Sequence, residues 1–168
     1  MLFRSIVFLL PLAPTLTVQD MEKSGLHESN VDLHIIRENH YDLMAACDAA
    51  MAASGTLALE LAILNIPMVV SYKVSPISYF LGRWFIKVQF VSLVNLIAGK
   101  EVVRELLQNM ATPENIYREM WRLLKNGEVQ RDMRQQLAEV AGQLGRPGAS
   151  NRTARLALEM IDGGWGGK

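Results

Sequence analysis

A single carboxylate, Glu60, lies in the most apolar stretch of the chain, just downstream of the triplet Ser54-Gly55-Thr56. From Leu57 to Tyr72 the only other ionisable group is the phenol of Tyr72. Burying an ionised carboxylate without a partner is costly, so we expect Glu60 to face a ligand or a cleft. Ser-Gly-Thr predicts a strand-to-helix turn, where free backbone N–H groups and the helix dipole favour an anion. Together these residues indicate a site with one end for a phosphate and another for a hydroxyl-bearing group.

The same residues also have a purely structural explanation. Ser54 is a favoured N-cap, Gly55 is a common turn residue, and Glu60 can point to solvent from one edge of its helix. The spacing alone leaves both interpretations open.

The composition narrows the class of protein. With 168 residues the chain is long enough for one domain with a real core. Half of the residues are apolar and 20% are charged, which excludes disorder as the main state. The 17 basic and 17 acidic residues cancel, so no overall positive charge points to nucleic acid.

Cysteine and histidine usage predicts neither a metal nor a cofactor. The one cysteine, Cys47, cannot form an internal disulfide, which is typical of a reducing compartment. It lies in a run of small and apolar residues that favours packing over nucleophilic chemistry. The three histidines show no ligand spacing with Cys47 or with one another: His27, His34 and His40.

Strand-like and helix-like segments alternate over the first two thirds of the chain. Apolar runs predict strands at 5–10, 31–36, 49–53, 67–72 and 90–93. Capping residues and apolar spacing predict helices at 18–24, 40–46, 57–64, 75–88 and 101–108. Repeated strand–helix units predict an α/β fold with a parallel sheet covered by helices on both faces. Ligands of such sheets bind beyond the carboxyl ends of the strands, where Ser54-Gly55-Thr56 and Asn95 are expected.

The last third of the chain is helical only. One helix is expected to begin at Thr112-Pro113 and to end at Asn126-Gly127, and two more are expected at 128–144 and 150–161. The predicted organisation is therefore a Rossmann-like sheet domain at 1–110, a helical carboxyl-terminal extension at 111–162 and a Gly-rich tail at 163–168.

Four stretches carry a family resemblance: Phe8-Leu9-Leu10-Pro11-Leu12-Ala13-Pro14-Thr15-Leu16, Ala53-Ser54-Gly55-Thr56-Leu57-Ala58-Leu59-Glu60, Pro67-Met68-Val69-Val70-Ser71-Tyr72-Lys73-Val74-Ser75-Pro76 and Val91-Ser92-Leu93-Val94-Asn95-Leu96-Ile97-Ala98-Gly99-Lys100-Glu101. In this order and spacing they closely resemble the carboxyl-terminal half of bacterial lipid-A-disaccharide synthase, an inverting glycosyltransferase of the GT-B type. The likeness extends over roughly residues 8–161.

The resemblance implies transfer of 2,3-diacylglucosamine from UDP-2,3-diacylglucosamine to 2,3-diacylglucosamine 1-phosphate, in lipid A biosynthesis. It implies a cytoplasmic protein, peripheral at the inner face of the inner membrane, and no nucleic acid partner. By position, the triplet would cradle the diphosphate and Glu60 would accept hydrogen bonds from the ribose hydroxyls. The full set of UDP-binding residues that it implies is Ser54, Gly55, Thr56, Glu60, Asn95 and Gln108.

The chain also departs from the family pattern. Val94 stands where Pro is usual, and Lys100 stands where Arg is usual, without the bidentate fork of Arg. The family's amino-terminal domain, with its acceptor site and general base, is not in this sequence, nor are the first strand and loop of the carboxyl-terminal half. The resemblance therefore implies a fragment that carries no catalytic residue and is inactive alone. Its expected protein partner is a separate amino-terminal half or a second copy of the chain.

A basic, aromatic segment is a second candidate surface. No acidic residue occurs from Leu61 to Lys100, and Arg83 and Lys87 share a helix face beside Trp84. Aromatic and basic side chains suit an interface with anionic lipid. The alternative is a helix that packs its aromatic side chains on the sheet and leaves its charges in solvent. Periodicity leaves both open, and the lipid-bearing substrates favour the membrane.

Two other functions remain open from the sequence. One is a different GT-B transferase that uses a UDP-sugar, which the family-specific string at 95–101 disfavours. The other is a non-catalytic nucleotide-binding remnant, which the missing first strand favours.

Overall fold

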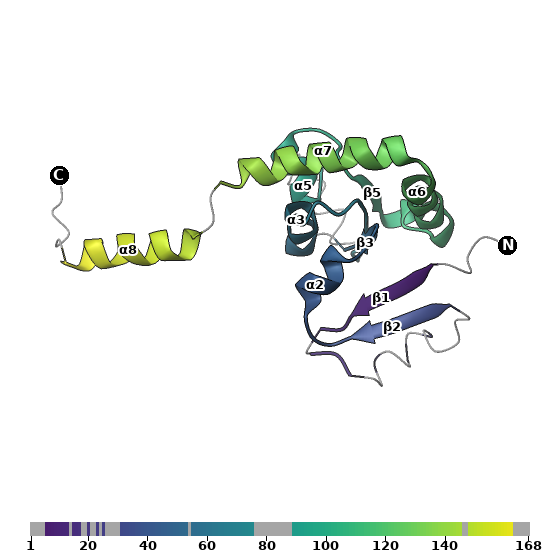
Figure 1. The fold of residues 1–168 in the computed structure, drawn as a ribbon, viewed down its shortest axis with the longest axis horizontal. Coiled ribbons are helices and arrows are strands. Elements are labelled where there is room, and N and C mark those ends of the chain that lie inside the picture. Colours follow the sequence, from purple (N-terminus) through teal and green to yellow (C-terminus); the bar gives the residue numbers. More distant parts are fainter. Residues whose placement is uncertain are drawn as a thin grey trace.

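The computed structural model describes residues 6–13, 15–17, 20, 23, 25, 31–53, 55–75, 89–145 and 148–162. Its strands are β1 (Val7–Pro11), β2 (Asp32–Ile36), β3 (Ala50–Ala52), β4 (Met68–Tyr72) and β5 (Arg104–Leu107). Its helices are α2 (His40–Ala45), α3 (Thr56–Ile63), α5 (Leu93–Ala98), the short 3-10 turn η2 (Gln108–Met110), α6 (Pro113–Lys125), α7 (Gly127–Gln143) and α8 (Ala149–Asp162). Strands and helices alternate along the chain from β2 to β5, and the last three helices follow, as Figure 1 shows; this confirms the predicted α/β class.

The strands form two parallel sheets. β1 pairs with β2, and β4 lies between β3 and β5 in a separate three-stranded sheet. Parallel pairing joins Ala50 to Met68 on one side of β4 and Val69 to Arg104 on the other. Figure 1 draws β1 and β2 apart from the other strands. The carboxyl ends of β3, β4 and β5 therefore meet at one edge of the larger sheet.

The core belongs to the three-stranded sheet and the helices around it. Residues Met68 to Val70 of β4 are buried, as a central parallel strand requires. Side chains of α6 and α7, among them Leu123 and Leu137, share this core with α3. Helices α6 and α7 and the three-stranded sheet thus share one hydrophobic core.

The helix starts follow the local capping chemistry. The hydroxyl of Thr112 accepts the N–H of Asn115, with Pro113 at the first position of α6. The side chain of Asn126 accepts two N–H groups of α7. The two helices confirm the one predicted from Thr112-Pro113 to Asn126-Gly127 and the one predicted at 128–144.

Two predicted elements between 90 and 108 are wrong. The strand expected at 90–93 is instead the segment that leads into α5, because Ser92 caps that helix and accepts the N–H of Asn95. The helix expected at 101–108 is instead β5, whose backbone pairs with β4 from Val69 to Tyr72. Pairing satisfies the free backbone groups of a buried strand edge, and this gain outweighs the helix propensity of a four-residue segment.

A buried polar network joins α5 to β5. The Asn95 side chain is fully buried; its Oδ1 accepts the N–H groups of Val102 at 2.8 Å and of Val103 at 2.9 Å. Its Nδ2 donates to the carbonyl of Val103 and to Oε1 of Glu105, both at 2.8 Å. All four hydrogen-bonding positions of this amide are therefore used inside the chain.

Glu105 completes the network from β5. Its Oε1 also accepts the N–H of Ser92 at 2.9 Å, and its Oε2 accepts the N–H of Val91 at 2.9 Å. A carboxylate at the start of α5 also interacts favourably with the helix dipole. Glu105 thereby holds the start of α5 against β5.

Two predicted helices lie wholly or largely outside the described residues. Residues 76–88 of the expected helix 75–88 are not described, and only single positions of the expected helix 18–24 are. At its start, the Thr17 hydroxyl and N–H both donate to the Asp20 carboxylate, and Asp20 N–H donates back to the hydroxyl. The Thr17 hydrogen bonds, led by that of the hydroxyl, lower the pKa of Asp20. This reciprocal contact is the capping arrangement expected for a helix that begins at Thr17.

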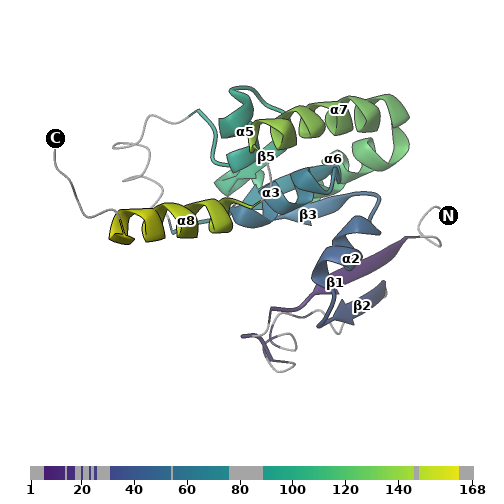
Figure 2. The ribbon, with the colours of Figure 1, turned by 60° about the vertical axis from the view of Figure 1, so that its left-hand side comes forward.

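The last helix, α8, extends away from the rest of the chain, as Figures 1 and 2 both show. Its side chains are exposed from Ala149 to Ile161. Among the described helices, none is both long and apolar enough to cross a bilayer.

We expect Asn95→Ala to destabilise the chain by about 2–4 kcal/mol, because it leaves the buried N–H groups of Val102 and Val103 without an acceptor. The measurement is the midpoint of urea unfolding. Asn115→Ala is the matched control, since the Asn115 amide donates one exposed hydrogen bond, to the carbonyl of Met110. Its expected cost is below about 1 kcal/mol. Equal shifts for the two variants would contradict a structural role for the Asn95 amide.

Candidate functional site

The candidate site lies at the carboxyl edge of the three-stranded sheet. Gly55 follows β3, Val74 follows β4 and Gln108 follows β5 directly. Since neighbouring strands are about 4.8 Å apart, β3 and β5 lie roughly 10 Å from each other across β4. Parallel α/β sheets bind their ligands at this edge.

Gly55 forms the turn from β3 into α3. Its backbone angles are φ 125° and ψ −155°, a conformation that L-residues other than glycine rarely adopt. A Cβ at this position would meet open space, so the constraint is conformational rather than steric. Gly55 is the N-cap of α3 and provides no side-chain hydrogen bond to the first turn. The start of α3 therefore presents backbone N–H groups that an anion can accept.

Thr56 and Glu60 lie on one face of α3, four residues apart. Thr56 is exposed and Glu60 is half-buried, while Ala58, Leu61 and Ala62 face the core. Within the described part of the chain, the Glu60 carboxylate has no hydrogen bond and no ion pair. It is thus available to accept hydrogen bonds from hydroxyl groups.

Gln108 combines two unusual features. Its backbone has φ 50°, which is uncommon for a residue with a side chain. Its Oε1 accepts the N–H of Val74 at 3.3 Å, so the amide nitrogen must point the other way. That Nε2 is buried and has no hydrogen-bond partner. A strained residue with an unpaired buried donor is a pattern that functional sites commonly show.

Asn95 takes a different place from the one that the resemblance implies. Its amide is committed to Val102, Val103 and Glu105, and it keeps no free donor or acceptor. Sequence reasoning did not identify Glu105, which anchors the same region. Its only signal was a carboxylate between Val103 and Leu106, in a segment predicted as a helix.

Other ionisable groups near these elements have local structural roles. Lys100 lies 3.8 Å from the Glu139 carboxylate on α7, and both side chains are exposed. The thiol of Cys47 donates to the carbonyl of Leu43. Burial, with a smaller contribution from Asp48, raises the pKa of Cys47, which disfavours the reactive thiolate. In the described residues, no three His, Cys, Asp or Glu side chains could hold a metal ion.

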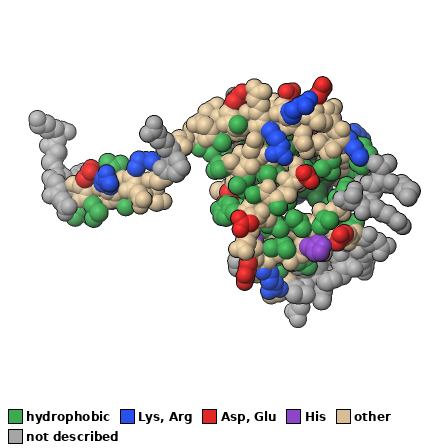
Figure 3. All heavy atoms as spheres, viewed as in Figure 1, with side chains coloured by type: hydrophobic (Ala, Val, Ile, Leu, Met, Phe, Trp, Pro, Cys, Tyr) green, Lys and Arg blue, Asp and Glu red, His purple; other side chains and the backbone are tan. Residues whose placement is uncertain are grey.

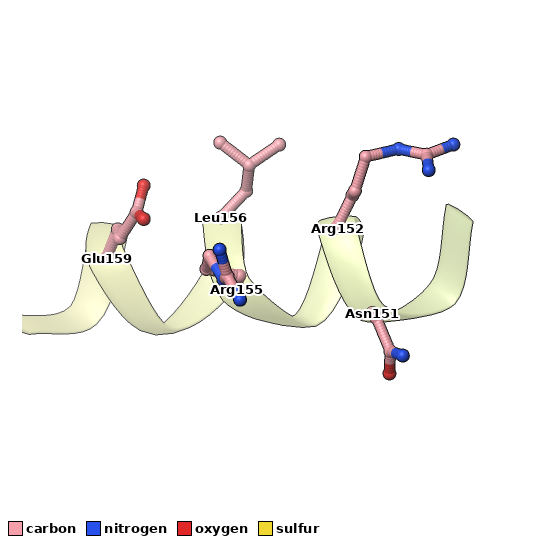
Figure 4. A pocket seen from close by; sticks show the side chains of 5 residues that line it. All are labelled: Asn151, Arg152, Arg155, Leu156 and Glu159. Atoms are coloured by element: carbon pink, nitrogen blue, oxygen red, sulfur yellow. The ribbon is translucent and has the colours of Figure 1, made fainter. Parts of the chain in front are cut away.

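Two surface hollows in the described part of the chain lie away from this edge. One runs along α6 and is lined by Pro113, Glu114, Tyr117 and Arg118. The other runs along α8, and Figure 4 shows its five lining side chains spread along one turn after another of that helix. Each is lined by a single helix, so neither encloses a ligand as a site between elements would.

The remaining predicted residues lie outside the described ranges. These are Ser54 of the triplet and the three membrane-facing candidates Arg83, Trp84 and Lys87. The structure places Gly55, Thr56 and Gln108 at this edge and Glu60 one turn further along α3, and it places Asn95 in the α5–β5 network.

Comparisons with known proteins agree on one family. The family model described as lipid-A-disaccharide synthetase matches residues 2–160. The chain is 40% identical over 155 residues to a lipid-A-disaccharide synthase of Trichlorobacter lovleyi, a match that covers 92% of this chain and 40% of the relative. It is 43% identical over 154 residues to that of Myxococcus xanthus, again with 92% and 40% covered. For the relative in Nitrosococcus oceani the identity is 42% over 158 residues, with 94% and 40% covered.

The chain thus spans about 40% of the length of these curated relatives. The family model, in contrast, matches nearly all of the chain. The chain belongs to the lipid-A-disaccharide synthase family of glycosyltransferases.

Proposed function

We propose that this chain is the donor-binding half of a lipid-A-disaccharide synthase and holds the UDP part of UDP-2,3-diacylglucosamine. The observation that carries the proposal is a set of hydrogen-bond donors without an acceptor at one edge of the sheet. These are the backbone N–H groups in the first turn of α3, which no side chain caps, and the unpaired Nε2 of Gln108. Both suit the oxygen atoms of a nucleoside diphosphate.

Each described group has a distinct part in this proposal. Gly55 and Thr56 offer backbone N–H groups to the diphosphate, together with Ser54 of the same triplet. Glu60 accepts hydrogen bonds from the ribose hydroxyls, one turn further along α3. Gln108 donates through Nε2 to an oxygen of UDP from the opposite end of the edge. Asn95 acts indirectly, by holding the segment that leads into β5.

The proposed reaction joins the diacylglucosamine of this donor to 2,3-diacylglucosamine 1-phosphate with inversion, and it needs a base for the acceptor hydroxyl. The Glu105 carboxylate already accepts three hydrogen bonds inside the chain. Glu60 is assigned to the ribose. Neither of these two carboxylates is therefore available as the base. We expect a partner to supply it, either a separate amino-terminal half or a second copy.

Attachment to the anionic inner face of the inner membrane, through Arg83, Trp84 and Lys87, stays a prediction from the sequence. The alternative of a non-catalytic nucleotide-binding remnant has one observation in its favour, the division of the strands into two sheets. A complementation assay separates the two functions.

We expect Glu60→Gln to weaken UDP binding by about 1.5–3 kcal/mol, the range for a hydrogen bond to a charged group. Isothermal titration of UDP measures the change. Glu114→Gln removes the same charge from the exposed start of α6 and should leave the affinity unchanged. The ribose assignment fails if Glu60→Gln binds UDP as tightly as the unaltered chain.

For Gln108→Glu we expect a loss of at least about 2 kcal/mol in UDP affinity. The new carboxylate keeps an acceptor for the N–H of Val74 but removes the Nε2 donor and repels the diphosphate. Gln130→Glu is the control, because the Gln130 side chain contacts the carbonyl of Asp48 away from the edge. Unchanged affinity for Gln108→Glu in the same titration would show that Gln108 does not contact UDP.

The isolated chain should show no release of UDP from UDP-2,3-diacylglucosamine when the acceptor is present. Addition of the remaining part of the Trichlorobacter lovleyi relative, made as a separate polypeptide, should restore measurable turnover. Steady turnover by the isolated chain would place the base within it. A complex that binds UDP without any turnover would favour the remnant.

A further inference from the structure

The described strands form two separate parallel sheets, with a break between β1 and β3. The first sheet has the order β2–β1 and the second has the order β3–β4–β5. In each sheet the strand that comes first along the chain lies at an edge. Doubly wound α/β folds commonly have the strand order 2-1-3-4-5 or the order 3-2-1-4-5-6. The first order requires β1 to pair with β3, and the described strands do not pair in that way.

The second order fits if one strand is added. With a further strand between β1 and β3, the series reads β2–β1–added strand–β3–β4–β5, which is the 3-2-1-4-5-6 arrangement. We propose that a parallel strand from the part of the relatives that this chain does not cover inserts between β1 and β3 and joins the two sheets into one. That part is more than half of the relatives' length.

The exposure of the strands supports this position. Strands of a parallel sheet are normally buried on both faces. Val69 in β4, which has a neighbour on each side, is 1% exposed. Met51 in β3 is 56% exposed and Val7 in β1 is 52% exposed. Figure 3 shows apolar side chains at the surface in the region where Figure 1 draws β1 and β2. Each strand that flanks the break therefore exposes an apolar side chain, although Ala52 of β3 is buried.

The backbone at both edges is oriented to receive the strand. In β3 the N–H of Ala50 donates to the carbonyl of Pro67, on the β4 side. Successive amides along a strand point to opposite sides, so the N–H and C=O of Met51 point away from β4. In the same way, the N–H of Leu12 donates to the carbonyl of Ile36 of β2, which directs the amide of Leu9 to the opposite edge of β1.

Pro11 agrees with this orientation of β1. It lies two residues after Leu9, so its missing N–H falls on the edge that faces away from β2. Proline has no N–H to donate, so a strand added at this edge can pair with Leu9 but receives no hydrogen bond from Pro11. The inserted strand therefore finds its hydrogen-bond partners at Leu9 and Met51, and its apolar side chains would cover both flanking strands.

Amide hydrogen exchange tests the proposal. One sample is the isolated chain, a second is the chain co-expressed with the remaining part of the Trichlorobacter lovleyi relative, and a third is a fusion with that part placed before Met1. In the complex and in the fusion, the amides of Leu9 and Met51 should exchange at least about tenfold more slowly than in the isolated chain. The amides of Leu12 and Ala50, already bonded within the two sheets, are the internal controls and should change less.

Two outcomes overturn the proposal. The first is slow exchange of Leu9 and Met51 in the isolated chain, which would mean that β1 and β3 pair directly. The second is fast exchange of both amides in the fusion, where association cannot fail. The experiment contains no UDP, so its result is independent of the proposed nucleotide site.

A pair of variants isolates the backbone contribution. Met51→Pro removes the N–H at the free edge of β3, whereas Met51→Thr keeps it and retains a residue suited to strands. Co-purification with the relative's part should be lost for Met51→Pro and kept for Met51→Thr. Equal co-purification of both variants would exclude a hydrogen bond at Met51.

Discussion

The position of every group in the candidate site depends on the parallel pairing of β4 with β3 and β5. This pairing fixes the register from Ala50–Met68 to Tyr72–Leu107 and brings three strand ends to one edge. β4 is buried because it has a neighbour on both sides and α6 packs on the sheet. The chain can therefore place Gly55 and Gln108, which are far apart in the sequence, at a separation set by the spacing of strands.

The polar residues near this edge divide into two groups by their hydrogen bonds. Asn95 and Glu105 have their partners inside the chain and hold α5 against β5. Glu60 and the Nε2 of Gln108 have none in the described residues; Glu60 lies in α3, and Gln108 follows β5 on the far side of β4. A buried amide with all its positions satisfied stabilises a fold, whereas an unpaired buried donor costs free energy until an acceptor arrives. The division separates the groups that hold the fold from those that we propose to contact UDP.

The sequence predicted the elements whose signals are local. Thr112 with Pro113 caps α6 as expected, and α7 and the strand and helix around Gly55 lie within a few residues of their predicted bounds. The segment from Val91 to Leu107 could not be predicted in this way. Its short apolar runs fit either a strand or a helix, and pairing with β4 decides between them. The contacts of Glu105 with Val91 and Ser92 depend on the same pairing, which explains why the sequence did not reveal its role.

The break between the sheets also bears on the candidate site. In a doubly wound sheet the ligand crevice opens where the strand order reverses, outside the carboxyl ends of the strands on either side. In this chain the order reverses between β1 and β3, and Gly55 follows β3 at that point. The strand proposed to fill the break would end beside the first turn of α3 and form the second wall of the crevice. Completion of the sheet and binding of the donor would then favour each other, because the added strand and the donor would both lie beside the turn from β3 into α3.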